Sequence, residues 1–109
     1  MIIRLYTYSN SFAIVADEII YSVKNLDTAF DLITSILENT TFVSEEVSII
    51  KKMPKKELKR YNISISKPET NKYKAHVGCL SFEWTTLEAA LTELSAYIKD
   101  PENVEKLYI

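Results

Sequence analysis

The sequence predicts an α+β fold: a single domain of two pseudo-repeated β-β-β-α units, in which two amphipathic helices pack on antiparallel sheet. Three observations predict it. The chain has 109 residues, the size of one domain. Two segments with helical spacing of apolar residues each follow segments in which apolar residues alternate. Residues 12–39 also lie without a gap over residues 73–100, an offset of 61 (73 minus 12), with the same apolar pattern.

The expected organisation is one domain over residues 1–109, with units 2–39 and 61–100 joined by a basic connection over residues 40–60. Neither unit is long enough to bury its apolar residues alone, so we expect both to share one core. Any antiparallel meander followed by a helix gives a similar pattern, so duplication and a common architecture are both open.

Each predicted helix has its apolar residues at i, i+3, i+4, i+7, i+10 and i+11, which is one stripe of a helix. These residues are Leu26, Ala29, Phe30, Ile33, Ile36 and Leu37 in the first helix, and Leu87, Ala90, Leu91, Leu94, Tyr97 and Ile98 in the second. Asn25 is expected to cap the first helix. Thr85, with Glu88 three residues later, has capping-box spacing for the second. Asp100-Pro101 should end it.

Three strands are predicted before each helix, and two-residue joins within each set are typical of tight hairpins. The strands are expected at 2–8, 12–16 and 19–23, and at 61–67, 72–77 and 80–84. Between the units, Val47-Ser48-Ile49 alternates like a strand, although the flanking charges of residues 44–53 also suit a short helix. Pro54 permits one helical turn through Leu58, and residues 107–109 could add an edge strand or cover the core.

Composition excludes several classes of protein. No apolar run approaches the ~18 residues of a membrane span, and the N-terminus lacks the pattern of a signal peptide. The single Cys79 cannot form an intrachain disulfide, so a reducing, cytoplasmic location is expected. A single glycine excludes glycine-rich phosphate-binding loops, and we expect no cofactor and no metal.

Catalytic chemistry has little support in the sequence. His76 is the only imidazole, and it lies three residues from Cys79 across a predicted turn. A Cys–His pair and an exposed histidine beside a turn cysteine are both consistent with this spacing. The acidic neighbours Glu45–Glu46 should diverge in a strand or turn and are typical of solvated acids. The protein is therefore expected not to be an enzyme.

Charge divides the chain into a basic middle and two acidic ends: residues 1–44 carry −3, residues 45–72 carry +4 and residues 73–109 carry −3. The basic residues of segment 51–60 are Lys51, Lys52, Lys55, Lys56, Lys59 and Arg60. This segment is consistent with a solvated connection, with contact to an acidic protein surface, or with binding to nucleic acid.

A second candidate contact lies in the first predicted strand, where Arg4, Tyr6 and Tyr8 share one side. If that strand lies at a sheet edge, they form an exposed row of residue types that dominate protein interfaces. Half-buried tyrosines that pack across strands are the alternative.

The second unit, with its strands YNISIS and KYKAHVGCLSFEW and its helix TTLEAALTELSAYI, resembles the β-β-β-α unit of HicB-type antitoxins. The likeness covers about a third of the chain. It implies a partial RNase H fold and a stoichiometric blocker. Those antitoxins usually carry a DNA-binding segment at the C-terminal end, whereas only nine residues follow Asp100 here.

These observations predict a non-catalytic interaction protein that occupies a partner's surface. An inhibitor, an antitoxin or an immunity-type protein fits, as does a phage or mobile-element inhibitor of nucleic-acid machinery such as an anti-CRISPR. The alternative is a nucleic-acid-binding accessory factor that uses segment 51–60. A protein partner is expected and a membrane is not. The predicted strand edges also allow a homodimer.

Overall fold

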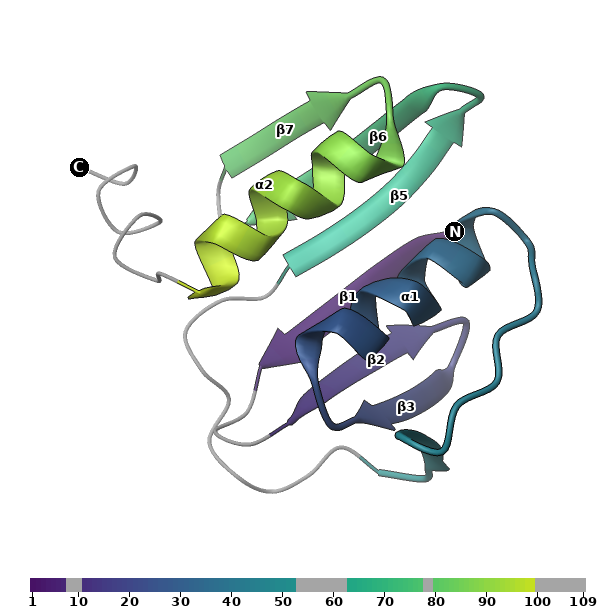
Figure 1. Cartoon of the computed structure of the whole chain (residues 1–109). Helices are drawn as coiled ribbons and strands as arrows, with labels where there is room; N and C mark the ends of the chain where they lie inside the picture. Colours follow the sequence, from purple (N-terminus) through teal and green to yellow (C-terminus); the bar gives the residue numbers. More distant parts are fainter. Residues whose placement is uncertain (8–10, 53–62, 78–79, 100–109) are drawn as a thin grey trace.

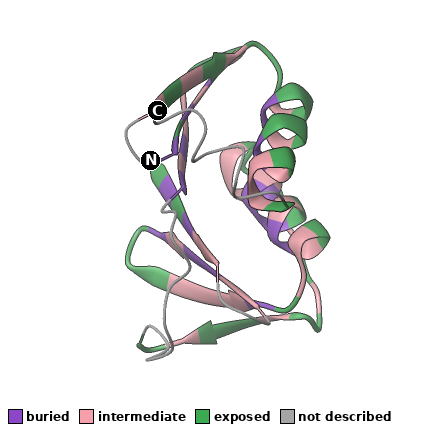
Figure 2. Cartoon of the chain, turned by 90° about the vertical axis from the view of Figure 1, so that its left-hand side faces the viewer, coloured by how far each residue is buried: buried purple, intermediate pink, exposed green. Residues whose placement is uncertain are grey.

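Seven antiparallel strands form one sheet in the order β4-β3-β2-β1-β5-β6-β7 (Figure 1). The computed structural model describes residues 1–7, 11–52, 63–77 and 80–99. The strands are β1 (Ile2–Thr7), β2 (Phe12–Ala16), β3 (Ile19–Val23), β4 (Val47–Ile50), β5 (Ile63–Glu69), β6 (Lys72–Val77) and β7 (Leu80–Trp84). The helices are α1 (Leu26–Leu37) and α2 (Leu87–Lys99). Both helices cover the same face of the sheet, and the opposite face has no described helix on it (Figure 2).

The middle of the sheet is the pairing of β1 with β5, where Ile3 lies opposite Ile65 and Leu5 opposite Ile63. β1 also pairs with β2, so both of its sides are occupied. The premise that the first strand lies at an edge is therefore wrong. The sequence contains no marker of this arrangement, because β5 reaches β1 only through a contact across about sixty residues of chain.

The two strands β2 and β3 are joined by a tight turn at Asp17-Glu18, as the two-residue spacing predicts. Both residues have positive φ, 46° for Asp17 and 69° for Glu18. Positive φ at both central positions is the geometry of a type I′ turn, whose twist matches that of paired strands. Ala16 and Ile19, which flank the turn, therefore form a hydrogen-bonded pair.

Capping differs from the prediction at the second helix. Asn25 caps α1 as expected, because its side-chain oxygen accepts a hydrogen bond from the Thr28 N–H at 2.8 Å. At α2 the hydroxyl of Thr86, not Thr85, accepts from the Ala89 N–H at 3.3 Å. The helix begins at Leu87, so Thr86 is the cap position and Thr85 lies one residue too early.

The core lies between the two helices and the sheet. α1 packs on β2 and β3, and α2 packs on β6 and β7. Of the predicted stripes, Ala29, Ile33, Ala90 and Leu94 are buried, Leu26 is half-buried, and the remaining members are half-buried and pack against the core. Leu32, outside the predicted stripe, is also buried. The fully buried large side chains are Ile3, Leu5, Ile14, Ile33, Ile65, Leu94, Val23 and Val77.

The α+β class and the two helices on antiparallel sheet are confirmed, in a single domain. The strand expected at Val47–Ile49 is present as β4, at one edge of the sheet. Within the described residues, no helix is both long and apolar enough to cross a membrane. The expected turns at Pro54 and at Gly78-Cys79, and the segment 107–109, lie outside the described residues.

Candidate interaction surface

The candidate surface is the face of the sheet that the helices leave uncovered. Ile3 and Leu5 are buried on the helix side, so their neighbours on β1 point to the opposite face. Arg4 is exposed there and Tyr6 is half-buried, near the centre of the sheet. Tyr8 lies outside the described residues. The predicted Arg/Tyr pair is therefore a face feature, not an edge feature.

The register extends this face across the N-terminal strands. Tyr6 lies opposite Ala13 and Arg4 opposite Val15. Val15 lies opposite Ile20, which in turn lies opposite Ile50. We call this surface the N-terminal half-face, and its residues are Ile2, Arg4, Tyr6, Ala13, Val15, Ile20, Ser22, Ser48 and Ile50.

Most of the N-terminal half-face is apolar. Ile2 is 60% exposed, Val15, Ile20 and Ile50 are half-buried, and Ala13 is buried between larger neighbours. An antiparallel sheet with one solvated face normally alternates apolar and polar residues along each strand. Strands β2 to β4 depart from this alternation, because both of their faces carry aliphatic side chains.

The C-terminal strands carry polar residues on the same face. The register of β6 and β7 repeats that of β2 and β3: His76 lies opposite Ser81, as Val15 lies opposite Ile20, and Lys74 lies opposite Glu83. We call this surface the C-terminal half-face, and its residues are Ser64, Ser66, Lys74, His76, Ser81 and Glu83. The uncovered face of the sheet is therefore mostly apolar on its N-terminal half and polar on its C-terminal half.

Sequence reasoning missed Val15, Ile20 and Ile50 as surface residues. The signal is present in the sequence, because Phe12–Ala16, Ile19-Ile20 and Ile49-Ile50 are uninterrupted apolar runs. An uninterrupted run in a strand means that both faces are apolar, whereas a half-solvated strand alternates. These runs are too short to span a membrane. They indicate instead strands whose uncovered face is also apolar.

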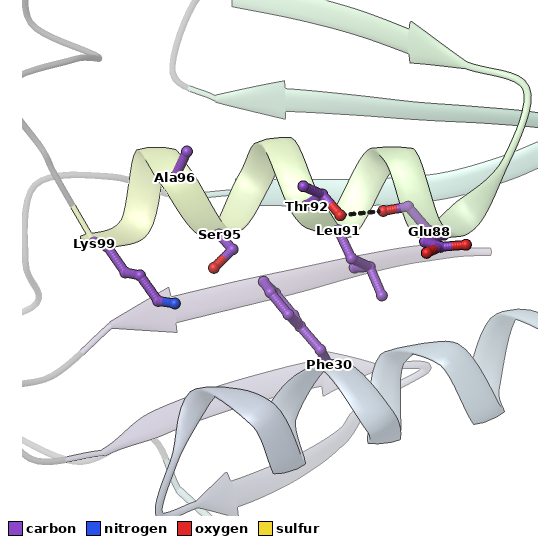
Figure 3. Close-up of a pocket in the computed structure, with 7 residues that line it drawn as sticks. All are labelled: Phe30, Glu88, Leu91, Thr92, Ser95, Ala96 and Lys99. Carbon is purple, nitrogen blue, oxygen red and sulfur yellow. Dashed lines mark hydrogen bonds between the residues drawn. The ribbon is translucent and has the colours of Figure 1, made fainter.

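A groove between the helices is the second feature of interest (Figure 3). The groove has a volume of about 590 Å³. Phe30 of α1 points across it toward α2, and Leu91 of α2 points back. The other lining residues come from α2, and they are Glu88, Thr92, Ser95, Ala96 and Lys99. The Thr92 hydroxyl is already bonded to the Glu88 carbonyl at 2.8 Å, so the groove offers mainly one ring and one aliphatic side chain.

A carboxylate joins the two halves on the helix side. Glu38, at the end of α1, accepts a hydrogen bond from the Tyr73 hydroxyl. It also forms an ion pair with Lys67, with 2.9 Å between the Lys67 Nζ and the Glu38 Oε2. The Lys67 ammonium also lies 5.4 Å from the centre of the Tyr73 ring. The hydrogen bonds from Tyr73 and then Lys67 lower the pKa of Glu38. All partners are mutually satisfied, so the cluster fastens α1 to the β5–β6 hairpin.

A second carboxylate is used at the start of α1. Glu46 accepts hydrogen bonds from the Thr28 hydroxyl and the Asn25 amide, which lower its pKa in that order. A negative charge at this position complements the helix dipole. Glu46 therefore holds the segment before β4 against the helix, and this arrangement explains the acidic residue directly in front of the strand.

Aromatic residues close the core beside β7. The Phe82 ring lies 5.8 Å from Trp84 and 5.3 Å from Tyr97 between centroids. Trp84 Nε1 donates to Glu93 Oε2 at 2.6 Å, and the Tyr97 hydroxyl donates to Glu93 Oε1 at 3.3 Å. Burial, together with the Glu93 charge, raises the pKa of Tyr97. Because both polar aromatic groups are bonded to Glu93, we interpret this cluster as packing.

The remaining sequence-predicted residues are only partly described. Lys51 and Lys52 are exposed just after β4, whereas Lys55, Lys56, Lys59 and Arg60 lie outside the described residues. His76 is exposed on the C-terminal half-face, and Cys79 lies outside the described residues. Among the described residues, no three His, Cys, Asp or Glu side chains gather where they could hold a metal ion.

Comparisons of the chain with protein-family models, with curated proteins and with solved structures found no match. The resemblance of the second unit to HicB-type antitoxins therefore rests on the residues quoted above.

Proposed function

We propose that this protein is a non-catalytic interaction protein that binds a protein partner stoichiometrically through its N-terminal half-face. The observation that carries the proposal is the aliphatic surface at Ile2, Val15, Ile20 and Ile50 on a sheet face without a described helix over it. Exposed apolar patches with polar residues at their rim are typical of protein–protein contact sites.

The C-terminal half supplies an internal comparison for this argument. Its strands β5, β6 and β7 are neighbours in the same order and its helix covers the same face, yet its half-face is built from serine, lysine, histidine and glutamate. A polar half-face is therefore compatible with this architecture. The aliphatic residues at Val15 and Ile20 exceed what the fold needs, and an exposed aliphatic residue raises the risk of aggregation unless something covers it.

Arg4 and Tyr6 fit the same role. Both lie beside the aliphatic residues on the central strand, and arginine and tyrosine are enriched among residues that dominate binding energy. An apolar surface with one cation and one phenol favours a partner surface that offers apolar side chains around a carboxylate. An inhibitor, antitoxin or immunity-type protein works in this way, including a phage or mobile-element inhibitor of nucleic-acid machinery.

We also propose that the two halves are pseudo-repeated copies of one β-β-β-α unit. The matched registers of β2–β3 and β6–β7 support this, as do the helix starts at Leu26 and Leu87, again 61 residues apart. In this view the two copies kept the same scaffold and diverged on the uncovered face. The N-terminal half-face then binds the protein partner, and the polar C-terminal half-face stays in contact with solvent.

The experiment is affinity capture from the native host, with mass spectrometry before and after nuclease treatment. Ile20→Lys tests the N-terminal half-face, and Ser81→Lys is its matched control at the corresponding position of β7. Tyr6→Ala and Ser66→Ala form a second pair. Circular dichroism checks that each variant folds.

The proposal expects a stoichiometric protein partner that survives nuclease, is retained by Ser81→Lys and Ser66→Ala, and is lost with Ile20→Lys and Tyr6→Ala. Equal capture by all four variants would contradict it. Loss of the partner on nuclease treatment, together with a steep fall in binding with salt, would instead favour the nucleic-acid-binding alternative through segment 51–60.

A further inference from the structure

The edge strand β4 has features that single it out from the rest of the described chain. It is the last strand of the sheet, and within the described residues nothing pairs with its outer side. Its sequence VSII holds no charge and no proline, and Ile49 is 70% exposed. Natural proteins usually protect sheet edges with charges, proline or bulges, so an apolar edge strand invites pairing with another strand.

The backbone of β4 shows which groups are available. Ile14 and Tyr21 are a hydrogen-bonded pair, because they lie two residues from the paired Ala16 and Ile19 at the type I′ turn. The alternate residues of β3, Ile20 and Ser22, therefore direct their backbone groups at β4.

Ser48 and Ile50 of β4 are their partners in the register. It follows that Val47 and Ile49 direct their backbone groups outward. Within the described residues, the Val47 N–H makes a 3.4 Å turn contact to the Ser44 carbonyl, which pairing with another strand would replace.

The residues around β4 read Glu45-Glu46-Val47-Ser48-Ile49-Ile50-Lys51-Lys52, acidic before the strand and basic after it. Such a segment is complementary to itself when reversed. Antiparallel pairing requires outward-directed residues to face each other. With Ser48 on the axis, Val47 faces Ile49 twice by symmetry, and Glu45, in the turn before the strand, comes beside Lys51, in the bend after the strand of the other copy.

We propose that β4 pairs antiparallel with β4 of a second copy of this chain, centred on Ser48, to give a two-fold dimer with one continuous sheet. Glu45 and Lys51 are both exposed and supply the charge complementarity. Val47 and Ile49 supply apolar cross-strand pairs and exchange backbone hydrogen bonds. The two N-terminal half-faces then adjoin, because Ile20 and Ile50 lie next to this edge. The proposal does not depend on the proposed function.

Charge exchange tests the register. Glu45→Lys and Lys51→Glu each place two like charges opposite one another across the proposed axis, so each variant alone should dimerise roughly tenfold more weakly than the unmodified chain. In an equimolar mixture of the two variants, each new lysine faces a new glutamate, and the heterodimer should recover the original affinity. Sedimentation equilibrium over a concentration series measures both quantities. Glu83→Lys, on the opposite edge strand β7, is the control and should change nothing.

Cross-linking tests the axis independently. In a Cys79→Ser background, Ser48→Cys should give a disulfide-linked dimer on mild oxidation, because a non-hydrogen-bonded antiparallel pair brings the Cα atoms within disulfide range. Ser81→Cys, on the same face at the β7 edge, should stay monomeric.

A monomer at all concentrations, no rescue in the mixture, or equal cross-linking at Ser48 and Ser81 would each overturn the proposal. Faster cross-linking through Ile49→Cys than through Ser48→Cys would overturn the stated register.

Discussion

The two halves of the sheet share a scaffold and differ in what they present to solvent. Val15 and Ile20 face each other in the N-terminal half, and His76 and Ser81 face each other at the corresponding place in the C-terminal half. Beneath them, Ile14 and Ala75 are both buried against the helices. The inner face is therefore constrained by packing, whereas the outer face is free to differ between the two halves.

The core should show the strongest likeness between the halves. Ile33 of α1 and Leu94 of α2 are each 1% exposed and occupy corresponding helix positions. Ile33→Ala and Leu94→Ala should each lower the free energy of unfolding by about 2–5 kcal/mol, since each leaves a cavity. Denaturant unfolding followed by both fluorescence and circular dichroism measures this. Two separate transitions would mean that the halves do not share one core.

The helix caps come next in size. Asn25→Ala and Thr86→Ala should each cost about 0.5–2 kcal/mol, because each removes a side-chain acceptor from a helix N-terminus. Asn25→Ala should be the more costly of the two, since Asn25 also donates to Glu46. Thr85→Ala is the matched control and should change stability by less than about 0.5 kcal/mol. A larger loss at Thr85 than at Thr86 would return the cap to the position expected from sequence.

The link between the halves should depend on pH. Hydrogen bonds from Tyr73 and Lys67 lower the pKa of Glu38 below its usual 4.5. A carboxyl with a lowered folded-state pKa stabilises the fold above its unfolded-state pKa, and that contribution is lost as pH falls through the folded-state value. The stability of the unmodified chain should therefore fall toward acid more steeply than that of Glu38→Gln.

The partners of Glu38 set the upper end of the pH range over which the cluster stabilises the fold. Hydrogen bonding to Glu38 raises the pKa of both Lys67 and Tyr73 above their usual 10.5 and 10.0. Their contributions are present below those values and are lost as the pH rises through the higher folded-state ones. Urea unfolding of the unmodified chain and of Glu38→Gln from pH 3 to pH 7 measures the predicted loss of stability in acid. Parallel curves would show that the carboxylate contributes nothing. Glu46 also has a lowered pKa, but its partners lie within one half of the molecule. Glu46→Gln therefore gives the acid dependence of a carboxylate that does not link the two halves.

The smallest effect is expected on the C-terminal half-face. Lys72 and Glu83 form an ion pair at 3.7 Å, and their side chains are 44% and 53% exposed. Because solvent and salt screen such a pair, Glu83→Gln should change the free energy of unfolding by less than about 1 kcal/mol. Thermal unfolding at low and high salt measures the difference. A large effect would show that the polar half-face is needed for folding and would weaken its use as a control.

Local features could be predicted from the sequence and distant ones could not. The helical stripes, the cap at Asn25 and the turn at Asp17-Glu18 depend on neighbouring residues, and all three are confirmed. The place of β1 in the sheet depends on pairing with β5, which no local pattern encodes. The error at Thr85 was avoidable, because the offset of 61 places Thr86 opposite Asn25.

Only part of the candidate surface could be predicted from the sequence, for the same reason. Arg4 and Tyr6 share a side because strands alternate, and this much followed from spacing alone. Which side the helices cover, and which residues of β2 to β4 join them on the other, depended on the register of the whole sheet.

The pairing of β1 with β5 also orders events during synthesis. β1 begins at Ile2 and is synthesised well before its partner β5, which begins at Ile63. Domains tend to fold from the N-terminus as the chain emerges. The emerging N-terminal half therefore displays a free β1 edge until β5 is made. A free strand edge invites pairing with other chains, so we expect the nascent chain to be most prone to aggregate before Ser66, the partner of Ile2, has been made.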